Sequence, residues 1–125
     1  ERCPMTWKPL SEEGIWDLVR AAEARMSVRQ AYLWEVIRIA PEKWTQHPYG
    51  DEGAGFGAVG LIGRFVVWYN DIEGSLNRSR YASYGAIDGY YCHQDDLEVT
   101  IEGLLGVIET GDEAGAFLGP PQPIR

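Results

Sequence analysis

The chain has 125 residues, 45% of them hydrophobic, and a formal net charge of −8 at pH 7. Its size and apolar content indicate one domain with a core of its own, and five Trp with seven Tyr exclude a disordered chain. The acidity argues against nucleic acid and anionic membranes as partners, since both select a basic surface, and it favours a cationic protein partner. The simpler alternative is that the charge only keeps the protein soluble.

The cysteine content and the N-terminus predict a cytoplasmic protein. Cys3 and Cys92 are too few for a disulfide framework and are interpreted as reduced thiols. No stretch approaches the ~18 apolar residues of a membrane span, and the N-terminus lacks the apolar centre of a signal peptide. Residues 1–10 are interpreted as a tail, in which residues 1–4 are a cloning remnant because Met5 can serve as the initiator.

Two helices are predicted before the first strand. The first begins after Ser11, an N-cap that is followed by two acids favoured by the helix dipole. The second begins at Ser27, where Gln30 completes a capping box, and Pro41 is expected to end it. Their apolar faces are assigned to Ile15, Leu18, Val19, Ala22 and Met26 in the first helix and to Tyr32, Leu33, Val36 and Ile37 in the second.

A β-hairpin is the clearest feature of the middle of the chain. Residues 40–53 are interpreted as a connector with a short strand at 43–46, and strands at 56–62 and 65–69 follow, joined by a type II′ turn at 63–64. This register places Ala58 opposite Tyr69 and Val59 opposite Trp68. Both faces of the hairpin are then apolar, so both are expected to be covered, one by helices and the other by a tail, a loop or a second subunit in a homodimer.

The remaining elements complete an α+β domain over residues 11–111. A polar loop is predicted at about 70–79, a third strand at about 80–87, and a fourth at 90–91. Asp95 and Glu98 predict a capping box for a last helix that Gly111 closes, with the apolar stripe Leu97, Ile101, Leu104, Leu105 and Ile108. The expected fold is a small antiparallel sheet of three to four strands on which two N-terminal helices and one C-terminal helix pack. Residues 112–125 are interpreted as a Pro/Gly-rich tail.

Several motifs resemble sites of cofactor or metal chemistry. The glycines of GFGAVG at 55–60 match a nucleotide-binding pattern, but a strand runs through them, so they are interpreted as room for the residues opposite or for a neighbouring backbone. Cys92, His93 and His47 lack the paired spacing of zinc ligands, and NDIEGSL lacks the ladder of acids of a calcium loop. We expect no cofactor and no metal, while a nucleophilic Cys92–His47 pair stays geometrically open.

The segment WYNDIEGSLNRSRY is the candidate site. Asp71 and Glu73 can pair with arginines across the loop, beside several aromatic rings. Three interpretations stay open: a satisfied connection, a recognition surface, or a catalytic site in which a carboxylate acts as base and an arginine holds an anion. The candidate partner- or ligand-binding residues are Trp68, Asn70, Asp71, Glu73, Asn77, Arg78, Arg80, Tyr81 and Tyr84.

The words HPYGDEG, VVWYNDIE and NRSRY resemble a group of small bacterial proteins without an established activity, over about half of the chain at 44–105. No site residue carries over from that resemblance. In size, acidity and order of elements the chain is also similar to SUKH-type immunity proteins, which is an analogy of architecture. The predicted function is a non-enzymatic protein-binding domain of immunity type; the alternative is a small ligand-binding protein or enzyme with a pocket near residues 70–81.

Overall fold

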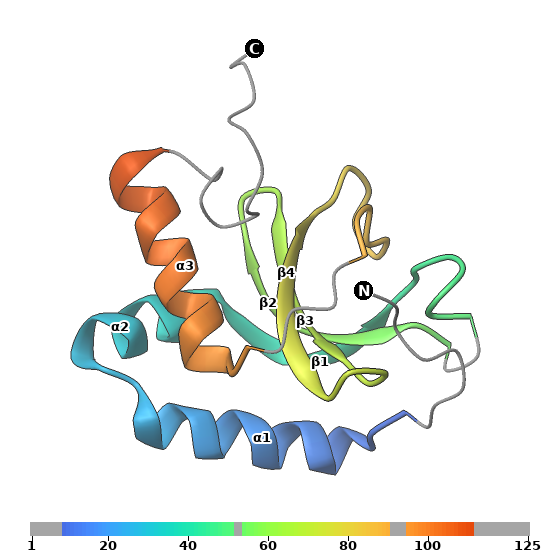
Figure 1. Ribbon diagram of the computed structural model, residues 1–125, viewed down its shortest axis with the longest axis horizontal. Helices are drawn as coiled ribbons and strands as arrows, with labels where there is room; N and C mark the ends of the chain where they lie inside the picture. The colour runs from blue at the N-terminus through green and yellow to red at the C-terminus, as the bar shows by residue number, and fades with distance from the viewer. Residues whose placement is uncertain (1–8, 52–53, 91–94, 112–125) are drawn as a thin grey trace.

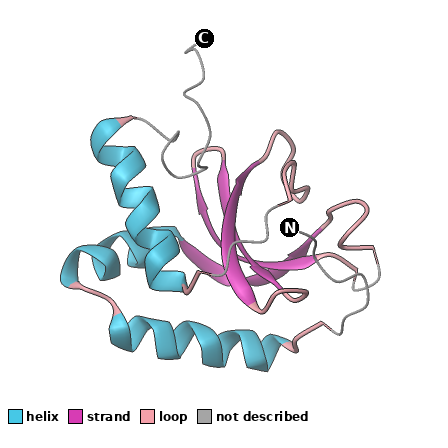
Figure 2. Ribbon diagram, viewed as in Figure 1, coloured by secondary structure: helices cyan, strands magenta, loops and turns pink. Residues whose placement is uncertain are grey.

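The computed structural model describes residues 9–51, 54–90 and 95–111 and shows three helices on a four-stranded antiparallel sheet (Figure 1). The elements are α1 (Glu12–Arg25), α2 (Val28–Ile37), β1 (Arg38–Trp44), β2 (Phe56–Ile62), β3 (Phe65–Asn70), β4 (Ser75–Arg80) and α3 (Leu97–Thr110). The strands lie in the order β1-β2-β3-β4. Helices gather on one side of the sheet, and the loops that follow β1 and β4 lie beyond its other side (Figure 2). The predicted α+β fold class is confirmed.

Both N-terminal helices begin at the predicted caps. The Ser11 hydroxyl accepts a hydrogen bond from the backbone N–H of Gly14, and Ser27 forms the full capping box with Gln30. The prediction that Pro41 ends α2 is wrong, because the helix ends four residues earlier and passes directly into β1. Among the described helices none has the length and apolarity needed to cross a bilayer.

The buried face of α2 differs from the prediction. Trp34 and Ile37 are buried, whereas Tyr32 and Val36 are 73% and 82% exposed. The Trp34 indole decides this orientation: it is the largest apolar side chain of the helix, and its Nε1–H donates to the Glu23 carboxylate of α1 at 2.8 Å. A buried indole needs both the apolar contact and a partner for its N–H, and this rotation of α2 supplies both.

Substitutions on the two faces of α2 test this orientation. Trp34→Ala is expected to lower the free energy of unfolding by about 3–5 kcal/mol, because it removes a buried aromatic side chain and leaves a cavity. Tyr32→Ala, measured in dilute solution, is expected to change it by no more than about 0.5 kcal/mol, because its ring is exposed on the chain. Denaturant unfolding of both variants provides the measurement, and comparable losses would contradict the orientation.

The first strand was largely missed by the sequence analysis. The predicted short strand at 43–46 is instead β1, which runs from Arg38 to Trp44. Its pairing with β2 is irregular between Arg38 and Glu42, and Pro41 lies inside this irregular stretch of an edge strand. An edge or a bulge is where a strand tolerates proline, since the missing N–H breaks no regular ladder bond there.

The β2–β3 hairpin forms with Gly63 at a positive φ of 56° in its turn. The predicted register holds from the turn back to residue 60 and then shifts. Ala58 pairs with Trp68, so the predicted pairs of Ala58 with Tyr69 and of Val59 with Trp68 are wrong. The irregularity behaves as a β-bulge, which adds one residue to one strand and reverses the faces of the residues beyond it. Val59 consequently packs with the helices and Ala58 on the opposite side.

The glycines of β2 let the helices approach the sheet closely. A Cβ atom at Gly57 would lie 2.7 Å from Ile15 Cδ1 of α1, and one at Gly60 would lie 3.1 Å from Trp34 Cζ3 of α2. The glycines do leave room for neighbouring groups, but at these two positions the nearest neighbours are helical side chains, and not the opposite residues or the backbone that the sequence predicted. No ordinary side chain fits at Gly57 without displacing α1 or its isoleucine.

Each face of the sheet has its own core, as expected from the apolar pattern. The helix-side core contains Ile15, Val19, Ala22, Trp34, Ile37, Val59, Val67, Leu76, Leu97, Ile101 and Leu104. The opposite core contains Trp44, Phe56, Ala58, Val66, Trp68 and Ile87, with Tyr49, Tyr81 and Tyr90 packed against it. The loops after β1 and β4 therefore supply the second cover, and this face needs no second subunit. Homodimerisation itself stays a prediction.

The strand β4 overturns the predicted loop at 70–79 and the predicted strand at 80–87. Its outer edge is partly occupied: the N–H of Leu76 donates to the Asp95 carbonyl at 2.9 Å, and the N–H of Asp88 donates to the Arg80 carbonyl at 3.3 Å. Tyr90 lies outside the strands, and residue 91 of the predicted fourth strand lies outside the described residues. Both ends of the outer edge of β4 are thus bonded to later segments of the chain.

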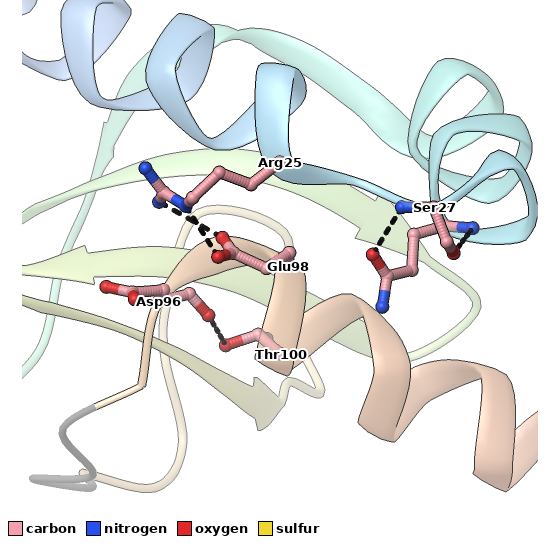
Figure 3. A network of polar contacts seen from close by, with 6 residues as sticks. Arg25, Ser27, Asp96, Glu98 and Thr100 are labelled. Atoms are coloured by element: carbon pink, nitrogen blue, oxygen red, sulfur yellow. Dashed lines mark hydrogen bonds and ion pairs between the residues drawn. The ribbon is translucent and has the colours of Figure 1, made fainter.

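The N-terminus of α3 differs from the predicted capping box. Asp96 occupies the N-cap position without a side-chain cap bond, and Glu98 binds Arg25 through hydrogen bonds of 2.6 and 3.1 Å (Figure 3). The Arg25 guanidinium lowers the pKa of Glu98. The Thr100 hydroxyl donates to the Asp96 carbonyl at 3.3 Å. Glu98, which was expected to complete a capping box with Asp95, therefore joins α3 to the end of α1.

The apolar stripes of α1 and α3 are confirmed at their centres. Ile15, Val19 and Ala22 are buried in α1, and Leu97, Ile101 and Leu104 are buried in α3. Leu18 and Ile108 are exposed, at 39% and 54%, so these two assignments are wrong. Gly111 ends α3 in the left-handed conformation, as predicted (φ 71°).

Candidate functional site

The turn of the candidate segment is organised by Asn70 at the end of β3. Its buried side chain accepts the backbone N–H groups of Ile72 (3.0 Å) and Glu73 (3.3 Å), and its Nδ2 donates to the Tyr90 hydroxyl at 3.2 Å. Gly74 completes the turn at φ 71°. An Asn that bonds the backbone two and three residues ahead stabilises a turn. The structure therefore places Asn70 as a support of the hairpin.

Asp71 fastens the segment before α1 to this turn. Its Oδ2 accepts the backbone N–H of Leu10, and its Oδ1 is buried without a hydrogen-bond partner in the described part of the chain. Burial raises the pKa of Asp71, opposed by the Leu10 hydrogen bond and by the charge of Lys43. The predicted pairing with Arg78 is wrong: Arg78 stands opposite Val67, four strand residues or about 13 Å from the turn.

The burial of Asp71 gives stability a testable pH dependence. Between its ordinary pKa of 3.8 and its raised folded value, the folded state binds more protons than the unfolded state. The contribution of this group is therefore fully present below 3.8 and is lost as the pH rises through the folded pKa. Asp71→Asn keeps an acceptor for Leu10 and cannot ionise, so we expect its stability to decline less than that of the unaltered chain from about pH 4 to about pH 7.

Denaturant unfolding at a series of pH values measures this difference. Asp88→Asn, which removes an exposed carboxylate, is the matched control and should keep the pH slope of the unaltered chain. A slope for Asp71→Asn equal to that of the control would show that Asp71 ionises at the same pH in the folded and unfolded states.

Arg78 lies between the sheet and α3 rather than on the surface. It is 9% exposed, and a Cβ atom at Gly103 of α3 would lie 2.1 Å from its Nη1. Burial lowers the pKa of Arg78, an effect that the charge of Asp95 opposes. The glycine in α3 makes space for the guanidinium, so this arginine is a packing element of the helix–sheet interface. The catalytic interpretation needs an arginine that can hold a substrate anion. Arg78 packs beneath α3 and is not placed to do so.

Two glycines of one helix isolate the packing of Arg78. Gly106→Ala places its Cβ in open space and should stabilise the protein by up to about 1 kcal/mol, the gain of Ala over Gly inside a helix. Gly103→Ala has the same helical gain but collides with Arg78, and we expect it to be less stable than Gly106→Ala by at least about 1 kcal/mol. Thermal and denaturant unfolding supply the comparison, and equal stabilities would contradict this packing.

Trp68 and Asn77 pair across β3 and β4 on the sheet face opposite the helices. Trp68 is fully buried, and its Nε1–H donates to the Ser79 hydroxyl at 3.0 Å. Ser79 donates in turn to the Gly89 carbonyl at 2.9 Å, which ties the 81–90 loop to the sheet. Asn77 is 2% exposed. These two predicted site residues therefore belong to the interior of the second core.

The remaining charged candidates lie apart. Arg80 is exposed at the end of β4 and places its guanidinium 5.2 Å from the centre of the Phe65 ring, on the helix side of the sheet. Burial raises the pKa of Tyr90, and the charge of Glu73, which is half-buried in the turn, adds to this rise. Asp71, Arg78 and Arg80 consequently do not form the single ionic cluster that the sequence suggested.

An exposed cluster does form around Tyr84, and we call Glu42, Trp44, Tyr81 and Tyr84 the aromatic edge. Tyr84 is 65% exposed, yet its ring lies 4.9 Å from the buried Trp44 ring and its hydroxyl donates to Glu42 Oε1. The Trp44 Nε1–H donates to the same oxygen at 3.0 Å. Tyr81 meets Trp44 edge-on, with 4.9 Å between ring centres. The bond to Glu42 raises the pKa of Tyr84.

The loop that carries Tyr84 is bonded to the end of β1. The Thr45 N–H donates to the Gly85 carbonyl at 2.8 Å, and the Ile87 N–H donates to the Thr45 carbonyl at 2.8 Å. These bonds form a short parallel bridge between Thr45 and Ala86. Tyr81 and Tyr84 are among the residues predicted from the sequence, whereas Glu42 and Trp44 are not, since no local pattern shows that residues 42–44 and 81–84 meet.

The described residues hold no group of three His, Cys, Asp or Glu side chains that could bind a metal ion. His47 contacts Asp51, with 2.8 Å between Nδ1 and Oδ2, and both side chains are exposed. Cys92 and His93 lie outside the described residues, so the Cys92–His47 pair stays a prediction.

Comparisons of the chain with protein-family models, with curated proteins and with solved structures find no match. The resemblances to the small bacterial group and to SUKH-type proteins consequently stay predictions. The function is therefore inferred from the geometry of this chain, in which the candidate Tyr84 combines an exposed side chain with contacts to Trp44 and Glu42.

Proposed function

We propose that this protein is a non-enzymatic binding domain whose aromatic edge recognises a cationic segment of a partner protein. The observation that carries the proposal is the combination of high exposure and tight fixation at Tyr84. Aromatic rings dominate binding energy at protein interfaces, and binding costs less entropy when a side chain is held in place beforehand. Tyr84 meets both conditions, because Trp44 and Glu42 fix its ring and hydroxyl.

The charge of the edge and of the whole chain supports a cationic partner. A Lys or Arg side chain is attracted by the face of a tyrosine ring and by a carboxylate such as Glu42 beside it. The net charge of −8 would also steer a basic partner toward the protein. An immunity-type role, in which the partner is a basic toxin, is the specific form of the proposal that matches the architectural resemblance.

The alternative of a small enzyme or ligand-binding protein near residues 70–81 receives less support. It requires a carboxylate and an arginine that face one reactant. Asp71 holds the backbone of Leu10, and Arg78 packs beneath α3. The groups that such a site would combine are therefore used separately within the fold.

Basic peptides test the proposal directly. The full chain is titrated with a panel of Lys- and Arg-containing peptides and with matched peptides that carry Glu instead, and calorimetry measures affinity. We expect binding of basic peptides only, weakened by salt and weakened about ten-fold or more by Tyr84→Ala. Ile108→Ala, which trims an exposed side chain on α3, should leave affinity unchanged.

Two further variants separate the contributions. Tyr84→Phe keeps the ring and loses the hydrogen bond to Glu42, and Glu42→Gln removes the charge while it keeps an acceptor oxygen. Both should bind basic peptides more weakly than the unaltered chain and more tightly than Tyr84→Ala. The proposal fails if no basic peptide binds, or if Tyr84→Ala and Ile108→Ala bind equally well.

A further inference from the structure

The outward face of α2 carries an apolar stripe that is separate from the aromatic edge. Val28, Tyr32 and Val36 are 67%, 73% and 82% exposed, and their spacing of four residues aligns them along one side of the helix. Other exposed apolar side chains of the helices, such as Leu18 and Ile108, occur singly. Scattered exposed apolar residues are normal on a protein surface, whereas a continuous patch marks an interaction site.

The stripe cannot turn inward, because α2 is fixed in rotation from its other side. Trp34 is buried and bonded to Glu23, and the Gln30 Nε2–H donates to Glu102 of α3 at 2.9 Å. The capping box at Ser27 fixes the start of the helix as well. The stripe is thus exposed in the folded chain, and the other helices do not cover it.

The charges beside the stripe favour a second copy of this chain over a cationic partner. α2 carries one basic residue, Arg29, and one acidic residue, Glu35, so it is neutral within a chain of net charge −8. Two acidic copies repel each other least where their surfaces carry little net charge, and α2 itself offers a basic partner no excess of acid. On a helical projection centred on Tyr32, Arg29 and Glu35 flank the stripe on opposite sides.

We propose that the stripe of Val28, Tyr32 and Val36 is the interface of a symmetric homodimer. A twofold axis parallel to α2 brings each stripe onto its copy and sets Arg29 of one chain on the same side as Glu35 of the other. The two residues are then offset by six positions, about 9 Å along the helix, which their long side chains can span as flanking pairs do in coiled coils. Arg29 contacts Glu109 within its own chain, and a guanidinium has five N–H donors, so both contacts can coexist.

Sedimentation velocity of the full chain, from low micromolar to sub-millimolar concentration, tests the interface. The unaltered chain should show a dimer fraction that grows with concentration. Tyr32→Glu should raise the dimer dissociation constant about ten-fold or more, because it buries a charge against the partner stripe. Ile108→Glu introduces the same charge at another exposed helical position and should leave the dissociation constant unchanged.

A charge exchange tests the geometry of the flanks. Arg29→Glu alone and Glu35→Arg alone should each weaken self-association, because each places like charges opposite one another twice in the dimer. An equimolar mixture of the two variants should recover association as a heterodimer, in which both flanking pairs are again of opposite sign. Circular dichroism and thermal melting of each variant show that the fold is kept, which matters for Arg29→Glu because it loses the contact with Glu109.

Four results would overturn the proposal. One is a chain that stays monomeric at every concentration, and another is a dimer that Tyr32→Glu leaves intact. A dimer that is lost in Tyr84→Ala instead would place the interface at the aromatic edge. A monomeric chain that begins to associate when Phe117→Glu is introduced would show that residues 112–125 of the same chain occupy the stripe.

Discussion

A sheet that is apolar on both faces has to be covered twice, and this constraint shapes the whole molecule. The three helices cover one face, so the connecting segments after β1 and β4 have to cover the other. The bulge in β2 distributes the side chains between the two cores, because it turns Val59 toward the helices and leaves Ala58 with the second core. The loop after β4 packs against the second core and therefore cannot move freely. This packing explains why the side chains of the aromatic edge are held in place.

The helical side depends on small residues at the points of closest approach. Gly57 admits Ile15 of α1, Gly60 admits Trp34 of α2, and Gly103 admits Arg78 of β4. Each glycine is matched with one large side chain, which is how closely packed layers avoid voids and collisions together. The exposed face of α2 is a by-product of this matching, since the helix that inserts Trp34 toward β2 has to present Tyr32 to solvent.

Several features that depend on neighbouring residues could be predicted from the sequence, although the capping box at Asp95 and the end of α2 at Pro41 were predicted wrongly; features that depend on distant residues could not be predicted. The caps at Ser11 and Ser27 and the turn at Gly63 are local, and all three are confirmed. The bulge in β2 and the strand β1 are settled by the residues they pair with, and the polar sequence of β4 resembles a loop until the partners of Arg78 and Ser79 are known.

The candidate site shows the same difference between features set by neighbouring residues and features set by distant ones. Tyr81 and Tyr84 could be identified as aromatic residues beside a polar segment, but their contacts with Trp44 cross about 40 residues of chain, which no local spacing reveals. The acids and arginines were grouped because they are close in sequence. The hairpin then separates them, because Asp71 and Glu73 lie in the turn while Arg78 and Arg80 lie farther along β4, at about 3.3 Å of rise per residue.

The edges of the sheet limit how a partner can bind. Partners that add a strand need an open row of backbone N–H and C=O groups. On β4 the N–H of Leu76 and the carbonyl of Arg80 are already bonded to later segments, while on β1 Pro41 interrupts the row and Thr45 bridges to Ala86. Main-chain pairing accepts many different sequences, and for this reason open strand edges promote aggregation. With both edges partly obstructed, the partner proposed for this protein would be recognised mainly through side chains, so its identity would depend on their chemistry.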